Sequence, residues 1–175
     1  MATSRLLLAP GASGSIERLR PIASALQAAG MTVELVPLPK GTAERAVPVY
    51  RSALDHEDLQ RTAIGGHSFG GRVASLVAAE ADPGPSALVL LSYPLHAPGR
   101  QEAWDERTRH WPSIRVPALV LSGEADPFAR LDLLRDAVTR LPDARLRTWP
   151  RLGHGLGPVV DEAVSEITAF LGGRT

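Results

Sequence analysis

The sequence of 175 residues contains no cysteine, which excludes disulfides, thiolate metal sites and a cysteine nucleophile. Acidic and basic residues balance at 19 each, so there is no overall positive field to attract nucleic acid. No apolar run is long enough to cross a bilayer, and the one at residues 6–9 is too short for a signal peptide. We therefore expect a cytoplasmic protein with neither a nucleic-acid partner nor a membrane partner.

The remaining composition is that of an ordinary globular protein. Hydrophobic residues make up 44% of the chain and charged residues 22%, close to the averages for folded domains. The length suits one hydrophobic core, and no linker, repeat or low-complexity tract interrupts it. We therefore expect a single domain over residues 1–175.

Short β-like runs alternate with helix-like segments along the whole chain. The unbroken apolar runs at residues 87–92 and 118–121 are typical of strands buried on both faces of a parallel sheet. Alternation of this kind indicates an α/β fold of about six mostly parallel strands with helices on both faces. The expected strands are residues 5–9, 32–36, 62–65, 87–92, 118–121 and 145–149.

Two segments are harder to assign. Residues 42–58 suggest a helix that is interrupted, or that begins, near Pro48. Residues 93–116 are irregular, and their tryptophans, Trp104 and Trp111, either cover part of a pocket or fill the edge of the core. The segment is too short for a full lid.

The run Gly66-His67-Ser68-Phe69-Gly70 lies between an expected strand and an expected helix, the setting in which Gly-x-Ser-x-Gly forms a nucleophile elbow. A side chain at either flanking position would collide with the neighbouring strand or helix, and glycine removes that collision. The pattern predicts Ser68 as a nucleophile.

A serine hydroxyl needs a base, and the base needs an acid that orients it. Asp126 and His154 each follow an expected strand, and open α/β sheets bind ligands beyond the carboxyl ends of their strands. Chain order then makes Asp126 the acid and His154 the base. Glu124 is a rival acid on the same loop, although the position before Pro127 fits better.

The other histidines have weaker claims. His67 is expected to pack beneath the elbow with its side chain directed away from Ser68. His56 and His110 are expected at the surface. His96 follows a strand end and is a candidate for lining the pocket.

The elbow, the stretch of residues 93–100 (Tyr-Pro-Leu-His-Ala-Pro-Gly-Arg) and the loop of residues 123–128 together resemble the compact, lidless α/β-hydrolases called dienelactone-hydrolase-like. The resemblance covers residues 5–171. It implies an α/β-hydrolase fold, a Ser68-Asp126-His154 triad, and cleavage of a small ester or thioester by acyl transfer without cofactor or metal. True dienelactone hydrolases use a cysteine nucleophile, so their substrate is not implied here.

The oxyanion of such a reaction needs backbone donors. The N–H of Phe69, directly after the nucleophile, is the first expected donor. The second should come from the loop after the first strand, where Pro10 has no N–H and Ala12 is the better candidate.

Two other functions are compatible with parts of the sequence. The run Gly11-Ala12-Ser13-Gly14 with Glu34 resembles a dinucleotide-binding start, but Glu17 stands where a third glycine is needed and would repel a pyrophosphate. A non-catalytic binding or scaffold protein on the same fold is the main alternative to a serine hydrolase.

Overall fold

The computed structural model describes residue 3 and residues 5–173. The single domain expected over residues 1–175 includes residues 1, 2, 4, 174 and 175, which lie outside the described residues. The described part contains a six-stranded sheet in the order β2-β1-β3-β4-β5-β6, with every neighbouring pair parallel. The strands are β1 (Arg5–Ala9), β2 (Thr32–Leu35), β3 (Thr62–His67), β4 (Leu88–Leu91), β5 (Ala118–Gly123) and β6 (Ala144–Trp149).

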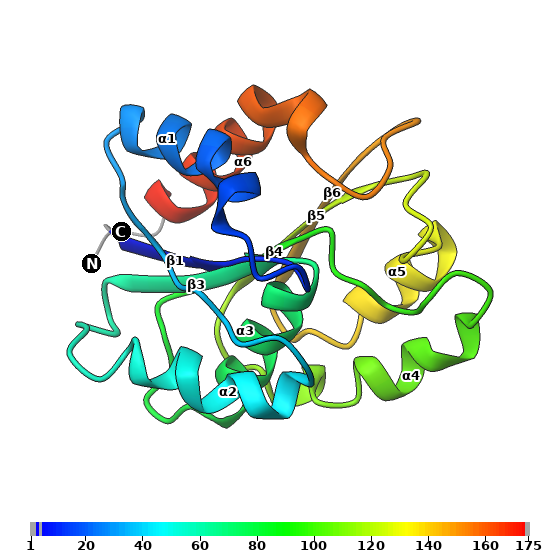
Figure 1. The fold of residues 1–175 in the computed structure, drawn as a ribbon, viewed down its shortest axis with the longest axis horizontal. Coiled ribbons are helices and arrows are strands. Elements are labelled where there is room, and N and C mark those ends of the chain that lie inside the picture. The colour runs from blue at the N-terminus through cyan, green and yellow to red at the C-terminus, as the bar shows by residue number, and fades with distance from the viewer. Residues whose placement is uncertain (1–2, 4, 174–175) are drawn as a thin grey trace.

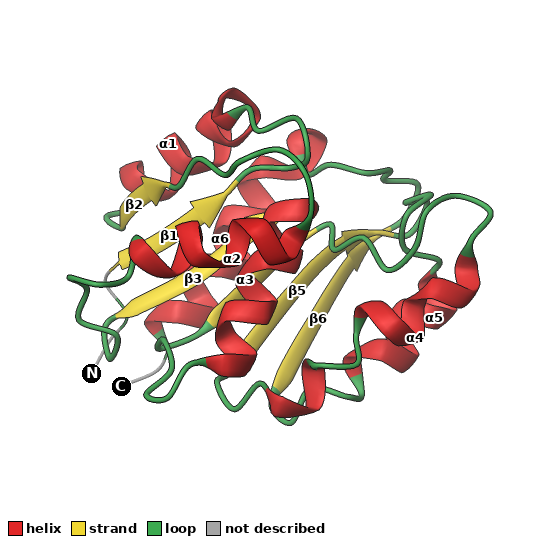
Figure 2. Ribbon diagram, turned by 60° about the horizontal axis from the view of Figure 1, so that its bottom comes forward, coloured by secondary structure: helices red, strands yellow, loops and turns green. Residues whose placement is uncertain are grey.

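Helices cover both faces of this sheet (Figures 1 and 2). On one face α1 packs against α6, and on the other α2 packs against α3. None of the described helices combines the length and the apolar character needed to cross a bilayer. The helices are α1 (Arg20–Ala28), α2 (Ala43–Ser52), α3 (Phe69–Glu80), α4 (Trp104–Arg107), α5 (Leu131–Val138) and α6 (Val160–Gly172), with the 3₁₀ helices η1 (Ile16–Leu19), η2 (Gln101–Ala103), η3 (Trp111–Ser113) and η4 (Gly157–Val159).

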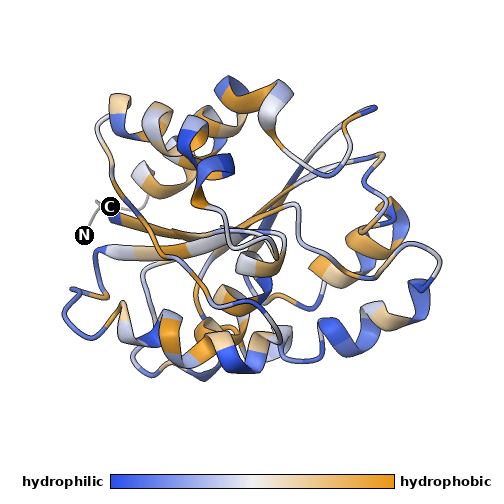
Figure 3. Cartoon of the chain, in the orientation of Figure 1, coloured by the Kyte–Doolittle hydropathy of each residue, from blue (hydrophilic) through white to orange (hydrophobic). Residues whose placement is uncertain are grey.

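The two faces of the sheet bury two separate hydrophobic cores. In β4, Leu88 and Leu90 belong to the core under α2 and α3, whereas Val89 and Leu91 belong to the core under α1 and α6. Successive strand residues point to opposite faces, so a strand covered on both sides must be apolar at every position. The surrounding helices mix hydrophobic and hydrophilic residues along their turns (Figure 3). The expected α/β fold, with helices on both faces, is confirmed.

Helix α2 differs from the sequence expectation, because it starts at Ala43 and continues through Pro48 without a break. A proline inside a helix removes one backbone hydrogen bond and costs about 3 kcal/mol. The helix nevertheless buries one continuous face, including Ala46, Val47 and Tyr50. Burial of that face outweighs the local penalty of the proline.

The segment of residues 93–116 fills the edge of the core. Trp111 is fully buried, with its ring edge against Tyr93 at 4.9 Å between centroids. The Trp104 ring lies under the Arg140 guanidinium, 4.2 Å from its carbon to the ring centroid. These tryptophans therefore fill the edge of the core rather than cover a pocket.

Tyr50 joins α2 to the centre of the sheet. Its buried hydroxyl lies 2.8 Å from the carbonyl oxygens of Leu7 and Gly65, and it accepts the N–H of Gly65 at 3.0 Å. Burial raises the pKa of this hydroxyl. The hydroxyl therefore satisfies backbone groups of β1 and β3 that water cannot reach.

We expect Tyr50→Phe to lower the free energy of unfolding by about 1 to 3 kcal/mol, because it leaves buried backbone groups without a partner. Urea denaturation measures this change, and an unaltered far-UV circular dichroism spectrum would show that the fold is retained. A loss below about 0.5 kcal/mol would contradict the role assigned to the hydroxyl.

Candidate active site

Ser68 alone forms the turn between β3 and α3, since β3 ends at His67 and α3 begins at Phe69. Its backbone has φ 51° and ψ −117°, and a positive φ in a non-glycine residue is strained. The Ser68 N–H donates to the Leu91 carbonyl at 2.8 Å, which fixes the turn to the end of β4. The hydroxyl therefore stands at the carboxyl edge of the sheet.

The glycines beside Ser68 allow this turn to pack closely. A Cβ at Gly66 would lie 2.7 Å from the Gly70 carbonyl oxygen. A Cβ at Gly70 would lie 2.5 Å from the Pro10 carbonyl oxygen and nearer still to that of Ala9. The start of α3 thus rests directly on the end of β1 and on the loop that follows it.

The structure brings Ser68, His154 and Asp126 together in one chain of hydrogen bonds. The Ser68 hydroxyl lies 2.9 Å from His154 Nε2, and His154 Nδ1 lies 2.8 Å from Asp126 Oδ2. A carboxylate only accepts, so Nδ1 carries the proton and Nε2 is left to accept from the serine hydroxyl. The side chain of Asp126 is fully buried, and that of His154 is 20% exposed.

The loop of residues 123–128, here called the acid loop, is hydrogen-bonded to the loop that carries His154. The Ala125 N–H donates to the Leu152 carbonyl at 2.9 Å, and Asp126 Oδ1 accepts the Phe128 N–H at 2.8 Å. Glu124, the rival acid, accepts instead from the Thr148 hydroxyl at 2.8 Å. Of the two carboxylates, it is Asp126 that hydrogen-bonds His154.

His96 does not line the pocket that adjoins His154; it is buried behind the acid loop. Its Nδ1–H donates to the Ala97 carbonyl at 2.9 Å, and its Nε2 accepts the Arg130 N–H at 3.1 Å. The His96 backbone N–H also donates to the Phe128 carbonyl at 3.1 Å. The Nε2 and the backbone N–H of His96 thus hold the segment after β4 against the chain between Phe128 and Arg130, whereas Nδ1 is bonded within its own segment.

His67 differs from the expectation of a side chain buried beneath the elbow. Its ring lies 5.1 Å from the His154 ring between centroids, and it lines the same pocket as His154. Burial lowers the pKa of His67 to about 4, with a further contribution from nearby His154. His67 is therefore neutral beside His154 at neutral pH.

Of the two expected oxyanion donors, Phe69 lies in the elbow itself and Ala12 lies on the loop after β1. Phe69 is the first residue of α3, and the first N–H groups of a helix have no acceptor within it. Gly11 adjoins the elbow, since a Cβ there would lie 3.7 Å from Ser68 Cβ. Ala12 follows Gly11 in an exposed turn.

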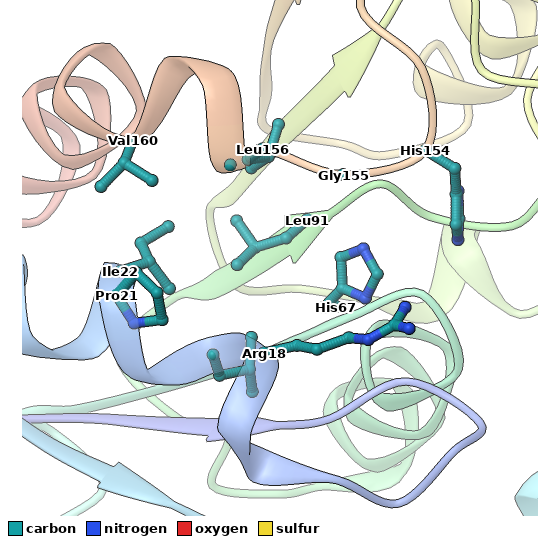
Figure 4. Close-up of a pocket in the computed structure, with 11 residues that line it drawn as sticks. Arg18, Pro21, Ile22, His67, Leu91, His154, Gly155, Leu156 and Val160 are labelled. Carbon is teal, nitrogen blue, oxygen red and sulfur yellow. The ribbon is translucent and has the colours of Figure 1, made fainter.

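A pocket of about 200 Å³ opens beside His154 (Figure 4). Its walls come from the start of α1, the end of β4 and the chain that leads from His154 into α6. The sequence indicates the apolar face of α1 but not this pocket. The pocket arises from the way α1 and α6 pack, and no local sequence pattern shows that packing. The lining residues are Arg18, Leu19, Pro21, Ile22, His67, Leu91, His154, Gly155, Leu156, Gly157 and Val160.

The features that suggested a dinucleotide site have other partners. Glu34 forms an ion pair with Arg5, and Glu17 pairs with Arg20 at 2.7 Å. An acidic residue that binds a ribose must keep its carboxylate available to the ligand. Pairing of Glu34 with Arg5 therefore does not support a dinucleotide site.

We expect Gly70→Ala to lower the melting temperature, although alanine is normally favoured over glycine within a helix by about 1 kcal/mol. The added methyl group would overlap the carbonyl oxygens of Ala9 and Pro10. Gly172→Ala in α6 is the matched control, because no described atom outside its chain neighbours and its own helix backbone lies within 4 Å of the added carbon. Calorimetry that found Gly70→Ala as stable as the parent protein would refute the close packing at the elbow.

Stability should also fall as the pH is lowered from about 7 to about 5. Burial lowers the pKa of both His67 and His110 to about 4. His110 was expected at the surface, but it is partly buried, and its Nε2 lies 2.8 Å from the Ser75 hydroxyl oxygen. Between the ordinary histidine pKa of 6.5 and about 4, the unfolded chain binds protons that the folded chain does not. Acidification therefore favours unfolding in that window.

Urea denaturation at the two pH values measures this loss of stability, and the double variant His67→Gln/His110→Gln should lose less than the parent. His56→Gln, at an exposed position, serves as the control and should behave like the parent. An equal loss in parent and double variant would show that other groups cause it. The carboxyl groups with lowered pKa start from ordinary values of 3.8 to 4.5, so they change charge mainly below the pH of about 5 at which this comparison ends.

Solved structures share this fold closely. A monoacylglycerol lipase from Paleococcus ferrophilus superposes with a TM-score of 0.85 at 14% identity, covering 99% of this chain and 96% of the lipase. An enol-lactonase from Burkholderia xenovorans gives 0.80 at 16% identity, covering 98% and 92%. A dienelactone hydrolase from Anabaena variabilis gives 0.74 at 25% identity, covering 97% and 85%.

Sequence comparison identifies the family. No curated protein matches the chain significantly. The model of a family described as an alpha/beta hydrolase domain matches residues 39–167, which include Ser68, Asp126 and His154. The chain therefore belongs to the α/β-hydrolase domain family, and it resembles the compact members that include dienelactone hydrolase.

Proposed function

We propose that this protein is a serine hydrolase that cleaves a small ester or thioester by acyl transfer through Ser68. The observation that carries the proposal is the hydrogen-bonded series Ser68–His154–Asp126, with contacts of 2.9 and 2.8 Å. Membership of the α/β-hydrolase family supports hydrolysis as the kind of reaction. The fold alone would not, because one fold can host unrelated functions.

In the first step, Ser68 Oγ attacks the carbonyl carbon while its proton passes to His154 Nε2. Asp126 holds the imidazole through Nδ1–H and stabilises the positive charge that forms on it. The imidazolium then gives its proton to the leaving oxygen or sulfur, the bond from that atom to the carbonyl carbon breaks, and an acyl group remains on Ser68. Water, activated by the same imidazole, releases the acid and restores Ser68.

The negative oxygen of the tetrahedral intermediate needs donors that are in place beforehand. The Phe69 N–H is suited to this role, since it begins a helix of 12 residues whose positive end faces Ser68. The second proposed donor is the N–H of Ala12, on the loop that packs against the elbow. This mechanism calls on no cofactor or metal ion.

A fluorophosphonate probe tests the proposal directly, because such probes react selectively with activated serine nucleophiles. We expect the intact protein to be labelled at Ser68, as read by mass spectrometry of the peptide. Ser68→Ala should abolish labelling and lower p-nitrophenyl acetate hydrolysis by about a thousandfold or more. Ser24→Ala, at an exposed serine on α1, is the matched control and should behave like the parent protein.

The same experiment distinguishes the hydrolase from a scaffold protein on this fold. His154→Ala and Asp126→Asn should slow labelling while leaving the circular dichroism spectrum unchanged, because they remove the base and its orienting partner. A well-folded parent protein that neither reacts with the probe nor cleaves any ester would favour the scaffold and refute the hydrolase.

A further inference from the structure

The pocket beside His154 has an apolar wall and one permanently charged group. Leu19, Ile22, Leu91, Leu156 and Val160 supply most of the wall. Of the described residues that line it, none is an aspartate or a glutamate. At about 200 Å³ it is smaller than the pockets of roughly 300 to 1,000 Å³ that hold drug-sized ligands. It therefore suits a short group rather than a long chain.

The charged group is Arg18, which lies on η1 immediately before α1. Figure 4 shows its side chain running along the pocket with the guanidinium beside His67. The charge of Arg18 contributes to lowering the pKa of His67, as a nearby cation would. Among the described residues, the Arg18 side chain forms no ion pair or hydrogen bond, and the neighbouring Glu17 is paired with Arg20.

An arginine without a partner at the rim of an apolar pocket is suited to binding an anion. Its planar guanidinium can donate two parallel hydrogen bonds to a carboxylate. His67 is neutral at neutral pH, so the positive charge beside it comes from Arg18. The chemistry of the walls thus matches a ligand with a short apolar portion that ends in a carboxylate.

The position of the pocket indicates which part of a substrate enters it. His154 must deliver a proton to the leaving atom, and His154 and Gly155 line the pocket. Neither Ser68 nor Phe69, which would hold the acyl carbon and the oxyanion, is among the lining residues. The pocket therefore lies on the side of the leaving group.

We propose that the pocket binds the leaving group of the substrate, and that Arg18 selects esters or thioesters whose alcohol or thiol part carries a carboxylate on a short apolar spacer. This inference rests on the proposed serine hydrolase function and names its substrate class. Arg18 acts here as a specificity-determining residue, since it contacts the substrate away from the reacting atoms.

Two acetate esters of nearly equal size and shape test this assignment, 4-acetoxybenzoate and 4-acetoxybenzamide. Both form the same acetyl-enzyme, so a difference between them in kcat/KM reports on the leaving group alone. Each value is divided by the rate of spontaneous hydrolysis of that ester. We expect the charged ester to be favoured about tenfold or more, the effect of one hydrogen bond between charged groups.

Arg18→Gln should bring this ratio close to one, and Arg18→Lys should retain part of it. Arg20→Gln is the matched control, because Arg20 lies two residues further on, is exposed, and does not line the pocket. Its ratio should equal that of the parent protein. High salt should also lower the ratio in the parent, since ions screen the attraction between exposed charges.

The outcomes separate this inference from the function on which it rests. If both esters are cleaved through Ser68 with a ratio near one, or if Arg18→Gln keeps the preference, the substrate class is wrong and the hydrolase stands. If no ester is cleaved and Ser68 is not labelled by the probe, the hydrolase itself is wrong, and the inference falls with it. A preference that depends on Arg18 supports both.

Discussion

The site depends on one backbone constraint, the abrupt reversal of the chain at Ser68. A parallel strand and the helix that follows it are joined here by a single residue in a strained conformation. Tertiary contacts must compensate for such strain, and they do so from three directions. The end of β4 accepts the Ser68 N–H, the glycines allow α3 to approach β3, and the loop after β1 packs on the first turn of α3.

The order of the strands explains how residues far apart in sequence meet at this turn. In the sheet, β3 is separated from β5 by β4 alone, and β6 follows β5. Their carboxyl ends lie at one edge, so the loops after β3, β5 and β6 bring Ser68, Asp126 and His154 together. The buried His96 adds the segment after β4 to this arrangement, because it ties that segment to the Phe128 carbonyl and the Arg130 N–H, which follow Asp126 in the chain. These loop side chains are therefore held in place by the sheet from which their loops emerge.

Most of this arrangement could be predicted from the sequence because it follows from local patterns. Apolar runs marked the strands, and the ends of those strands marked Ser68, Asp126 and His154, which the structure brings within hydrogen-bonding distance. The sequence alone does not decide between Asp126 and Glu124, since two carboxylates on one loop differ only in the direction of their side chains.

Other features depended on contacts between distant segments and could not be predicted. Helix α2 continues through Pro48 because the sheet buries its apolar face. His67 was expected beneath the elbow but lines the pocket, whereas His96 was expected to line the pocket but does not. Their environments are set by how α1, α6 and the acid loop pack, which no local pattern records. The position of Arg18 at the pocket is likewise set by this packing.

In the proposed reaction, the hydroxyl of Ser68, activated by His154, attacks a carbonyl whose oxygen is held at the start of α3. A crystal structure of the protein after reaction with a fluorophosphonate measures this most directly. We expect phosphorus bonded to Ser68 Oγ, with the phosphoryl oxygen about 2.7 to 3.1 Å from the Phe69 nitrogen. An adduct on another residue, or a phosphoryl oxygen directed to solvent away from Phe69, would contradict it.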